Sequence, residues 1–399
     1  MTQKAFARSG WRFFVAFMAC VPLLACSDDE SEETGATDAG LMDGGGTDTG
    51  AGGAIATTCN APPPLVLVAN IAGSNLLPVM EDFLYQEAGV GSAPGSIRRV
   101  ASAGGIVTTL FTAAAQHVIA GFMVNATDIV FVDDDYTAAP TKSRVMKMPI
   151  AGGTPTQVGI DLAEARVVGI DAASVYVVSK AAGKQRVARI ALGGGGAATI
   201  ADVDGSTMLG TQLVGAKLYF TQTLPMMTGA FGYNVLDVSA AAALPTPFGV
   251  VKSGTCLVQL QPVVFGSTAV VCTTGSGGSR VVALDLDGMN PRPLIERANS
   301  GPFFNVLASA GDTFYMQQLP SKAQLNDGAL YKMELASPNA LVPVACGRGV
   351  VKNRLFRSVP TLDSVEIAVG PTRVAWIEQR QEATGLTFTL FTKERIPSI

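Results

Sequence analysis

The chain has 399 residues, with 28 Lys and Arg against 32 Asp and Glu and a formal net charge of −4 at pH 7. Its basic residues form no run or patch, which argues against nucleic acid as a partner. One histidine in the whole chain argues against most zinc sites and against Ser-His-Asp or Cys-His catalysis. We therefore expect no metal, no cofactor and no catalytic residue of these kinds.

Residues 1–25 have the pattern of a secretory signal peptide. Lys4, Arg8 and Arg12 supply a positive region, and the apolar stretch 13–24 follows. That stretch is too short to cross a bilayer as a helix, but it has the length of a signal-peptide core. Removal of these three cations would leave a net charge of −7 on the exported chain.

The residues LLAC at 23–26 resemble the bacterial lipobox. The resemblance implies that Cys26 receives a diacylglycerol and that the protein is held in the cell envelope, in the outer membrane and facing the periplasm or the surface. The protein would then be attached to its partner, the membrane, through this lipid anchor. An ordinary signal peptide followed by a chance cysteine is the alternative.

Residues 26–57 are rich in Gly, Asp, Ser, Thr and Glu, and their few apolar residues show no periodicity. Such a segment cannot bury enough surface to fold. As a flexible coil it would have ends roughly 30 Å apart. We expect three parts: a signal peptide at 1–25, a disordered acidic tether at 26–57, and a folded domain at 58–399.

The folded domain contains a repeat with a period of roughly 40 to 50 residues, which is typical of propellers. Each unit has a short apolar strand, then an alternating strand, then a turn rich in Gly or Pro. The apolar strands are expected at 65–68, 129–132, 175–178, 218–220, 269–272, 313–316 and 374–377. The alternating strands are expected at 96–100, 144–148, 186–190, 234–238, 280–284, 329–333 and 388–392.

With another apolar run before each unit, the repeat predicts an all-β fold, a β-propeller of four-stranded antiparallel blades. Seven blades fit best, although six would fit if one end unit were divergent. The longest spacings suggest insertions at 74–94 and 347–359. Because no strand fits after Thr392, a segment around Ala54–Thr58 is expected to complete the ring.

The runs SRVMKMPIAGGTP at 143–155 and SRVVALDLDGMNP at 279–291 resemble the repeats of TolB-like and YWTD-like β-propellers. In those families an aromatic strand precedes a strand that ends in such a turn. The resemblance extends from about Pro64 to the C-terminus and implies a propeller fold. No unit carries the YWTD tetrapeptide itself.

Four cysteines follow Cys26, and an even number in an exported chain favours two disulfides. Three pairings are open, of which we prefer Cys256 with Cys272 and Cys59 with Cys346. The first pair would lie within one unit. The second would tie the start of the ring to its closing region.

Among the remaining polar residues, His117 is expected in a capping or surface role at a blade junction. The acidic runs 133–135 and 202–204 are expected to be solvated turns, because neither matches a calcium loop. Five aromatic residues are expected to pack between blades rather than form a sugar platform: Phe231, Tyr233, Phe303, Phe304 and Trp376.

These features favour an exported lipoprotein whose propeller is a non-catalytic scaffold for a protein partner. Two alternatives stay open: a hydrolase or lyase with carboxylates at the propeller funnel, and a receptor for a glycan or small ligand. An enzyme should bring two or more carboxylates with perturbed pKa values to one place, whereas a scaffold should not.

Overall fold

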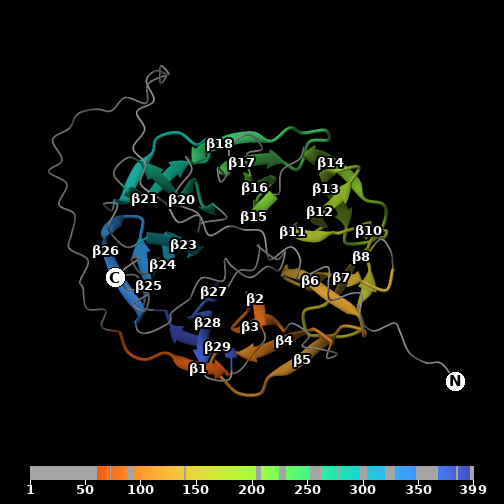
Figure 1. The fold of residues 1–399 in the computed structure, drawn as a ribbon, viewed down its shortest axis with the longest axis horizontal. Helices are drawn as coiled ribbons and strands as arrows, with labels where there is room; N and C mark the ends of the chain where they lie inside the picture. The colour runs from red at the N-terminus through yellow and green to blue at the C-terminus, as the bar shows by residue number, and fades with distance from the viewer. Residues whose placement is uncertain are drawn as a thin grey trace. The chain divides into compact units, whose positions relative to one another are not determined.

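Seven small antiparallel sheets form a ring, so the protein is a seven-bladed β-propeller (Figure 1). The computed structural model describes residues 61–69, 71, 73–87, 94–138, 141–203, 208–223, 231–251, 262–275, 278–296, 303–319, 329–346, 367–382 and 385–395. All of them belong to one compact unit. The predicted all-β fold with seven blades is confirmed.

The first three blades follow one another along the chain. Blade 1 comprises β2 (Gly73–Val79), β3 (Asp82–Glu87), β4 (Ser96–Ala101) and β5 (Thr108–Thr112). Blade 2 comprises β6 (His117–Val124), β7 (Asp128–Asp135), β8 (Lys142–Pro149) and the short outer pieces β9 (Thr156–Gln157) and β10 (Leu162–Ala163). Blade 3 comprises β11 (Arg166–Ile170), β12 (Ser174–Ala181), β13 (Lys184–Ala191) and β14 (Ala198–Val203).

The next three blades repeat the same up-and-down order. Blade 4 comprises β15 (Met208–Val214), β16 (Lys217–Thr223), β17 (Phe231–Asp237) and β18 (Thr246–Val251). Blade 5 comprises β19 (Val263–Phe265), β20 (Thr268–Gly275), β21 (Gly278–Asp285) and β22 (Arg292–Glu296). Blade 6 comprises β23 (Phe303–Ala310), β24 (Thr313–Leu319), β25 (Ala329–Glu334) and β26 (Ser337–Cys346).

Blade 7 is built from both ends of the described chain. It comprises β27 (Ile367–Val369), β28 (Arg373–Glu382), β29 (Gly385–Glu394) and, as its outermost strand, β1 (Leu65–Val68). In Figure 1, β1 lies beside β29, and the two strands pair antiparallel. The innermost strands contact one another in sequence, and β27 contacts β2. The ring is therefore closed by a strand from the N-terminal side of the chain.

Lys393 adds a second tie at this closure. Its ammonium donates hydrogen bonds to the carbonyl of Val344 in blade 6 (2.6 Å) and to the carbonyl of Pro62 just before β1 (3.2 Å). Burial lowers the pKa of Lys393. The side chain thus links the last blade to its neighbour and to the closing segment.

Each seam between neighbouring blades holds its own apolar cluster, which explains why the inner strands are apolar on both faces. The seam between blades 7 and 1 is typical: Leu67 of β1 packs in one cluster with Phe83 of β3 and Ile377 of β28. Near the axis of the ring, the innermost strands of neighbouring blades approach each other even more closely. A Cβ at Gly169 of β11 would lie 2.9 Å from the Leu213 Cβ of β15, so only glycine fits there.

The sequence predictions hold for most strands but fail at the N-terminal end of the ring. All seven alternating strands are confirmed, as are six of the seven apolar strands. The run 65–68 is not the apolar strand of the first unit but the outer strand of the last blade, and 74–94 is no insertion, because it contains β2 and β3. Ala54–Thr58 and 347–359 lie outside the described residues.

Candidate functional site

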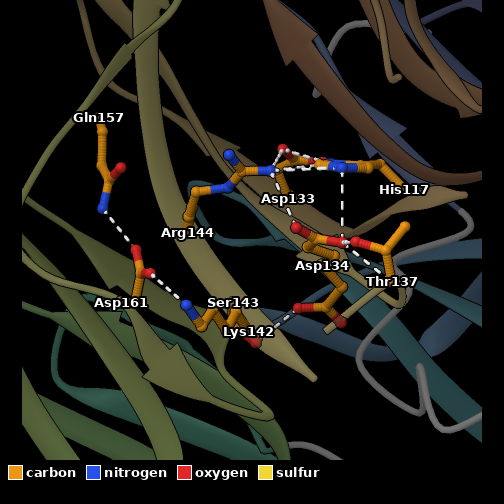
Figure 2. Close-up of polar contacts among 10 residues, drawn as sticks. His117, Asp133, Asp134, Thr137, Lys142, Ser143, Arg144, Gln157 and Asp161 are labelled. Atoms are coloured by element: carbon orange, nitrogen blue, oxygen red, sulfur yellow. Dashed lines mark hydrogen bonds and ion pairs between the residues drawn. The ribbon is translucent and has the colours of Figure 1, made fainter. Parts of the chain in front are cut away.

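The largest group of interacting charged side chains in the described residues lies at one end of blade 2. The strand register brings it together: His117 is opposite Asp135 in the β6–β7 pair, and Asp133 is opposite Arg144 in the β7–β8 pair. This end carries the β7–β8 connection and the link from blade 1. Figure 2 shows His117, Asp133 and Arg144 converging there.

Strand alternation sends the three consecutive aspartates to opposite faces of the blade. Phe131 packs in the seam with blade 1, and Val132 packs in the seam with blade 3. Asp133 and Asp135 continue on the blade 1 side, whereas Asp134 continues on the blade 3 side. Neighbours in sequence therefore belong to two separate polar groups.

On the blade 1 side, Asp133 is the shared acceptor of a buried network. The Nδ1 atom of His117 lies 3.0 Å from both carboxylate oxygens of Asp133, and Nη2 of Arg144 lies 3.2 Å from Oδ2. The Nη2 atom is also 2.9 Å from Nδ1. A lone pair on Nδ1 would face the carboxylate, so we place a proton there, directed to Asp133. The guanidinium and the imidazole then both donate to one carboxylate.

The second nitrogen of the imidazole also faces a carboxylate. The Nε2 atom of His117 lies 3.7 Å from Oδ1 of Asp135. The turn holds Asp135 in place, because Thr137 donates from its hydroxyl (2.5 Å) and from its backbone N–H (2.9 Å). These bonds, with smaller contributions from His117 and Arg144, hold the pKa of Asp135 below its usual value. Asp135 is therefore ionised at neutral pH.

On the blade 3 side, Asp134 is buried, and burial raises its pKa to about 6. Ser143 donates its hydroxyl to Asp134 (2.5 Å), and the same Oγ accepts the backbone N–H of Ala165 (2.8 Å). Asp133 and Glu164 raise the pKa of Asp134 further by charge repulsion. Asp134 and Ser143 thus join blade 2 to the start of blade 3.

Asp134→Asn should make the protein more stable at neutral pH. The folded-state pKa lies above the unfolded value of 3.8, so the folded protein binds more protons between the two values and its stability falls as pH rises. The wild type should lose up to about 3 kcal/mol between about pH 4 and pH 7, and the variant should not lose this contribution. Urea titrations of both proteins across this range measure it.

Asp202→Asn is the matched control for that experiment. The hydrogen bond from Arg186 lowers the pKa of this exposed carboxylate, so its pH dependence has the opposite sign. If Asp134→Asn were less stable than the wild type at neutral pH, the raised pKa of Asp134 would be wrong.

Two sequence predictions are corrected at this site. His117 is not a surface residue: it begins β6, its side chain is 13 % exposed, and it is bonded to Asp133. Residues 133–135 are not a solvated turn, because they are the last three residues of β7. Each of the three aspartates accepts a hydrogen bond from a neighbouring side chain. The strand can therefore continue through three consecutive acidic residues.

Further ion pairs lie at the same end of blades 1 and 3. Glu87 pairs with Arg98 in blade 1. In blade 3, Arg186 pairs with Asp202 (2.7 Å) and Lys180 pairs with Glu164 (3.2 Å), which precedes β11. We call this end of blades 1 to 3, with these pairs and the blade 2 network, the charged end.

The described residues offer no metal site, since they contain no group of three or more His, Cys, Asp or Glu side chains arranged to hold an ion. They also contain no helix long and apolar enough to cross a membrane. Of the predicted packing aromatics, Tyr233 and Trp376 are buried as expected. The side chains of Phe231, Phe303 and Phe304 lie outside the described ones.

Two of the four cysteines predicted to form disulfides, Cys272 and Cys346, lie in described strands. Cys346 ends β26 and is disulfide-bonded, but its partner is not among the described side chains. Cys272 lies within β20, and Cys26, Cys59 and Cys256 fall outside the described residues. The pairing and the lipidation of Cys26 stay predictions.

Comparison with solved structures confirms the β-propeller that the sequence resemblance implied. A manganese complex of oligogalacturonate lyase matches with a TM-score of 0.58 and 14 % identity, over 84 % of this chain and 96 % of that chain. The propeller domain of the Trilobed protease from Pyrococcus furiosus matches with a TM-score of 0.56 and 10 % identity, over 82 % and 97 %. That domain is described as having an open velcro topology, whereas β1 closes the ring here.

A puromycin-hydrolyzing peptidase of Mycobacterium tuberculosis matches with a TM-score of 0.52 and 14 % identity, over 81 % of this chain. This chain spans only about half of that protein, 52 % of its length. Identities this low establish the fold alone. No family model and no curated protein sequence matches the chain.

Proposed function

We propose that the protein is a lipid-anchored component of the bacterial cell envelope whose propeller is a non-catalytic domain that binds a protein partner. The observation that carries the proposal is the orientation of the carboxylates at the charged end. Asp134 and Asp135, the carboxylates of the blade 2 network with shifted pKa values, point to opposite seams and do not converge on one space. Paired carboxylate catalysis needs both groups to flank one bond.

The other reactive groups of the charged end are also engaged. Both ring nitrogens of His117 face carboxylates, so neither is turned to a substrate as a base. The hydroxyl of Ser143 is fully buried, donates to Asp134 and accepts from the backbone N–H of Ala165, so it is held within the join of blades 2 and 3 and is not accessible to a substrate. These contacts support the scaffold over the hydrolase or lyase alternative.

The outer ion pairs of the charged end suit a protein partner. The side chains of Lys180 and Glu164 are about 60 % exposed, and Arg186 and Asp202 are also accessible. Positively and negatively charged side chains alternate over the three blades. A surface of this kind gives orientation and selectivity through complementary charges. We expect a partner with mixed charge, bound less tightly at high salt.

Cys26→Ser should release the protein from membranes and abolish its labelling with palmitate. The thiol of this residue is the atom that the proposed lipid modifies, and one serine hydroxyl does not replace it. Fractionation of cells grown with labelled palmitate measures both effects. Cys20→Ser, inside the signal peptide, is the matched control and should leave both unchanged. Normal labelling of the Cys26→Ser protein would rule out the anchor.

A further inference from the structure

A pocket of about 690 Å³ lies at the seam of blades 4 and 5, away from the charged end. Lys217 begins β16, Ser267 precedes β20, and Asp285 ends β21. These positions are at the opposite end of their strands from the network of blade 2, which lies where β7 ends and β8 begins. The volume falls within the range of about 300–1,000 Å³ that is typical of small-ligand pockets.

The turn after β21 is pressed against blade 4, and this gives the pocket its shape. Gly288 has a φ of +80°, and a Cβ there would lie 3.3 Å from the backbone of Phe248. Phe248 is in turn fixed by an edge-to-face contact with Tyr219, with ring centroids 5.4 Å apart. The turn is therefore packed closely against Phe248, and Leu286 and Asp287, just before Gly288, line the pocket with it.

Exposed apolar side chains lie beside the pocket residues in sequence. Leu244 is 82 % exposed and precedes Thr246, and Met289 is 61 % exposed and follows Asp287. The pocket itself is lined by the apolar residues Val235, Pro247 and Leu286, and apolar residues are typical of the lining of small-ligand sites. They indicate a ligand with an apolar body.

The charged residues that line the pocket are one cation, Lys217, and two carboxylates, Asp285 and Asp287. Asp285 and Asp287 lie on the blade 5 side, where Asn290 donates to Oδ2 of Asp285 (2.7 Å) and the backbone N–H of Met289 donates to Oδ1 of Asp287 (2.9 Å). Arg292 lies 3.7 Å from Asp285. One oxygen of Asp287 accepts no hydrogen bond from a described residue.

The ammonium of Lys217, on the blade 4 side, forms no hydrogen bond or ion pair with another described side chain. Its register partner Asp237 accepts hydrogen bonds from the hydroxyl (2.6 Å) and the backbone N–H (2.9 Å) of Ser239, and the charge of Lys217 makes a smaller contribution to the lowered pKa of Asp237. The pocket therefore presents an ammonium on one side and two carboxylates on the other, with an apolar floor between them.

We propose that this pocket binds a short peptide that carries a basic residue beside a large apolar one. The basic group pairs with Asp285 and Asp287, the apolar side chain covers Pro247 and Leu286, and Lys217 receives a carboxylate or carbonyl of the peptide. Arginine suits the acidic side best, because its planar group can bind carboxylates through two hydrogen bonds.

Calorimetric titration of the full-length protein with the dipeptides Arg-Leu and Glu-Leu tests the proposal. Arg-Leu should bind at millimolar concentration or below, and Glu-Leu should bind at least about tenfold more weakly, because a charge-assisted hydrogen bond is replaced by repulsion. Amidation of the C-terminus of Arg-Leu should weaken its binding through the loss of the Lys217 contact.

Asp287→Asn keeps the acceptor for the N–H of Met289 and removes the charge, so it should fold and should weaken Arg-Leu about fivefold or more. Asp202→Asn at the charged end is the control and should bind Arg-Leu as the wild type does. Equal binding of the two dipeptides, no binding of Arg-Leu, or full binding by Asp287→Asn would each overturn the proposal.

Discussion

Leu67→Asp should lower the free energy of unfolding by about 3–5 kcal/mol. Leu67 is the buried residue of β1 and packs in the apolar cluster between blades 7 and 1. A carboxylate in this place would lose the packing of the leucine and would be desolvated without a partner. Because β1 closes the ring, blade 7 should open first. Urea unfolding followed by circular dichroism, with limited proteolysis of the C-terminal blade, measures the effect.

Val66→Asp is the control, since Val66 is the preceding residue of β1 and is 49 % exposed. It adds the same charge to the same strand, and its cost should stay within about 0.5 kcal/mol. Equal stability losses for the two variants would mean that β1 does not close the ring as described.

Asp133→Ala should lower the free energy of unfolding by about 2–4 kcal/mol. Asp133 is the common acceptor for His117 and Arg144, and its own side chain is 10 % exposed. Its removal leaves two donors, one of them a guanidinium, without their shared acceptor, and only the more distant carboxylate of Asp135 remains, 3.7 Å from His117 and 3.9 Å from Arg144. Asp133→Asn keeps an acceptor of the same shape and should cost less. Chemical unfolding of both variants at neutral pH provides the comparison.

The exposed pair of Arg186 and Asp202 provides the contrast for this prediction. Asp202→Ala breaks a pair that is solvated, so it should cost no more than about 1 kcal/mol. A loss for Asp133→Ala as small as that for Asp202→Ala would show that the blade 2 network contributes little to stability.

The repeat pattern predicts most of the fold because each blade buries both faces of its inner strands, and this leaves a periodic signal in the sequence. The pattern gives a wrong prediction where an outer strand has the apolar composition of an inner strand. The run LVLV at 65–68 resembles an inner strand, yet two of its four side chains are exposed at the outer edge of blade 7. The β2–β3 hairpin is hidden because Met80, with a φ of +52°, stands in a turn where glycine or asparagine is expected.

The candidate site is harder to predict, because no sequence motif marks its residues and only the strand register brings them together. His117 follows an alanine-rich link, and three consecutive aspartates look like a solvated turn. The missing information is the β7–β8 register, which places Arg144 opposite Asp133 and Ser143 opposite Asp134. Aligning the two strands as a hairpin would have offered this signal. The shifted pKa of Asp134 depends on burial against blade 3, which no local pattern reveals.

Photo-crosslinking in intact cells shows whether the charged end binds a protein partner. A photoreactive amino acid is placed at Lys180 on the charged end or at Ala126, an exposed residue of the β6–β7 turn at the opposite end of its blade. We expect a discrete crosslinked protein from position 180, less of it when Arg186→Glu is added, and none from position 126. No product from position 180, or the same product from both positions, would contradict it.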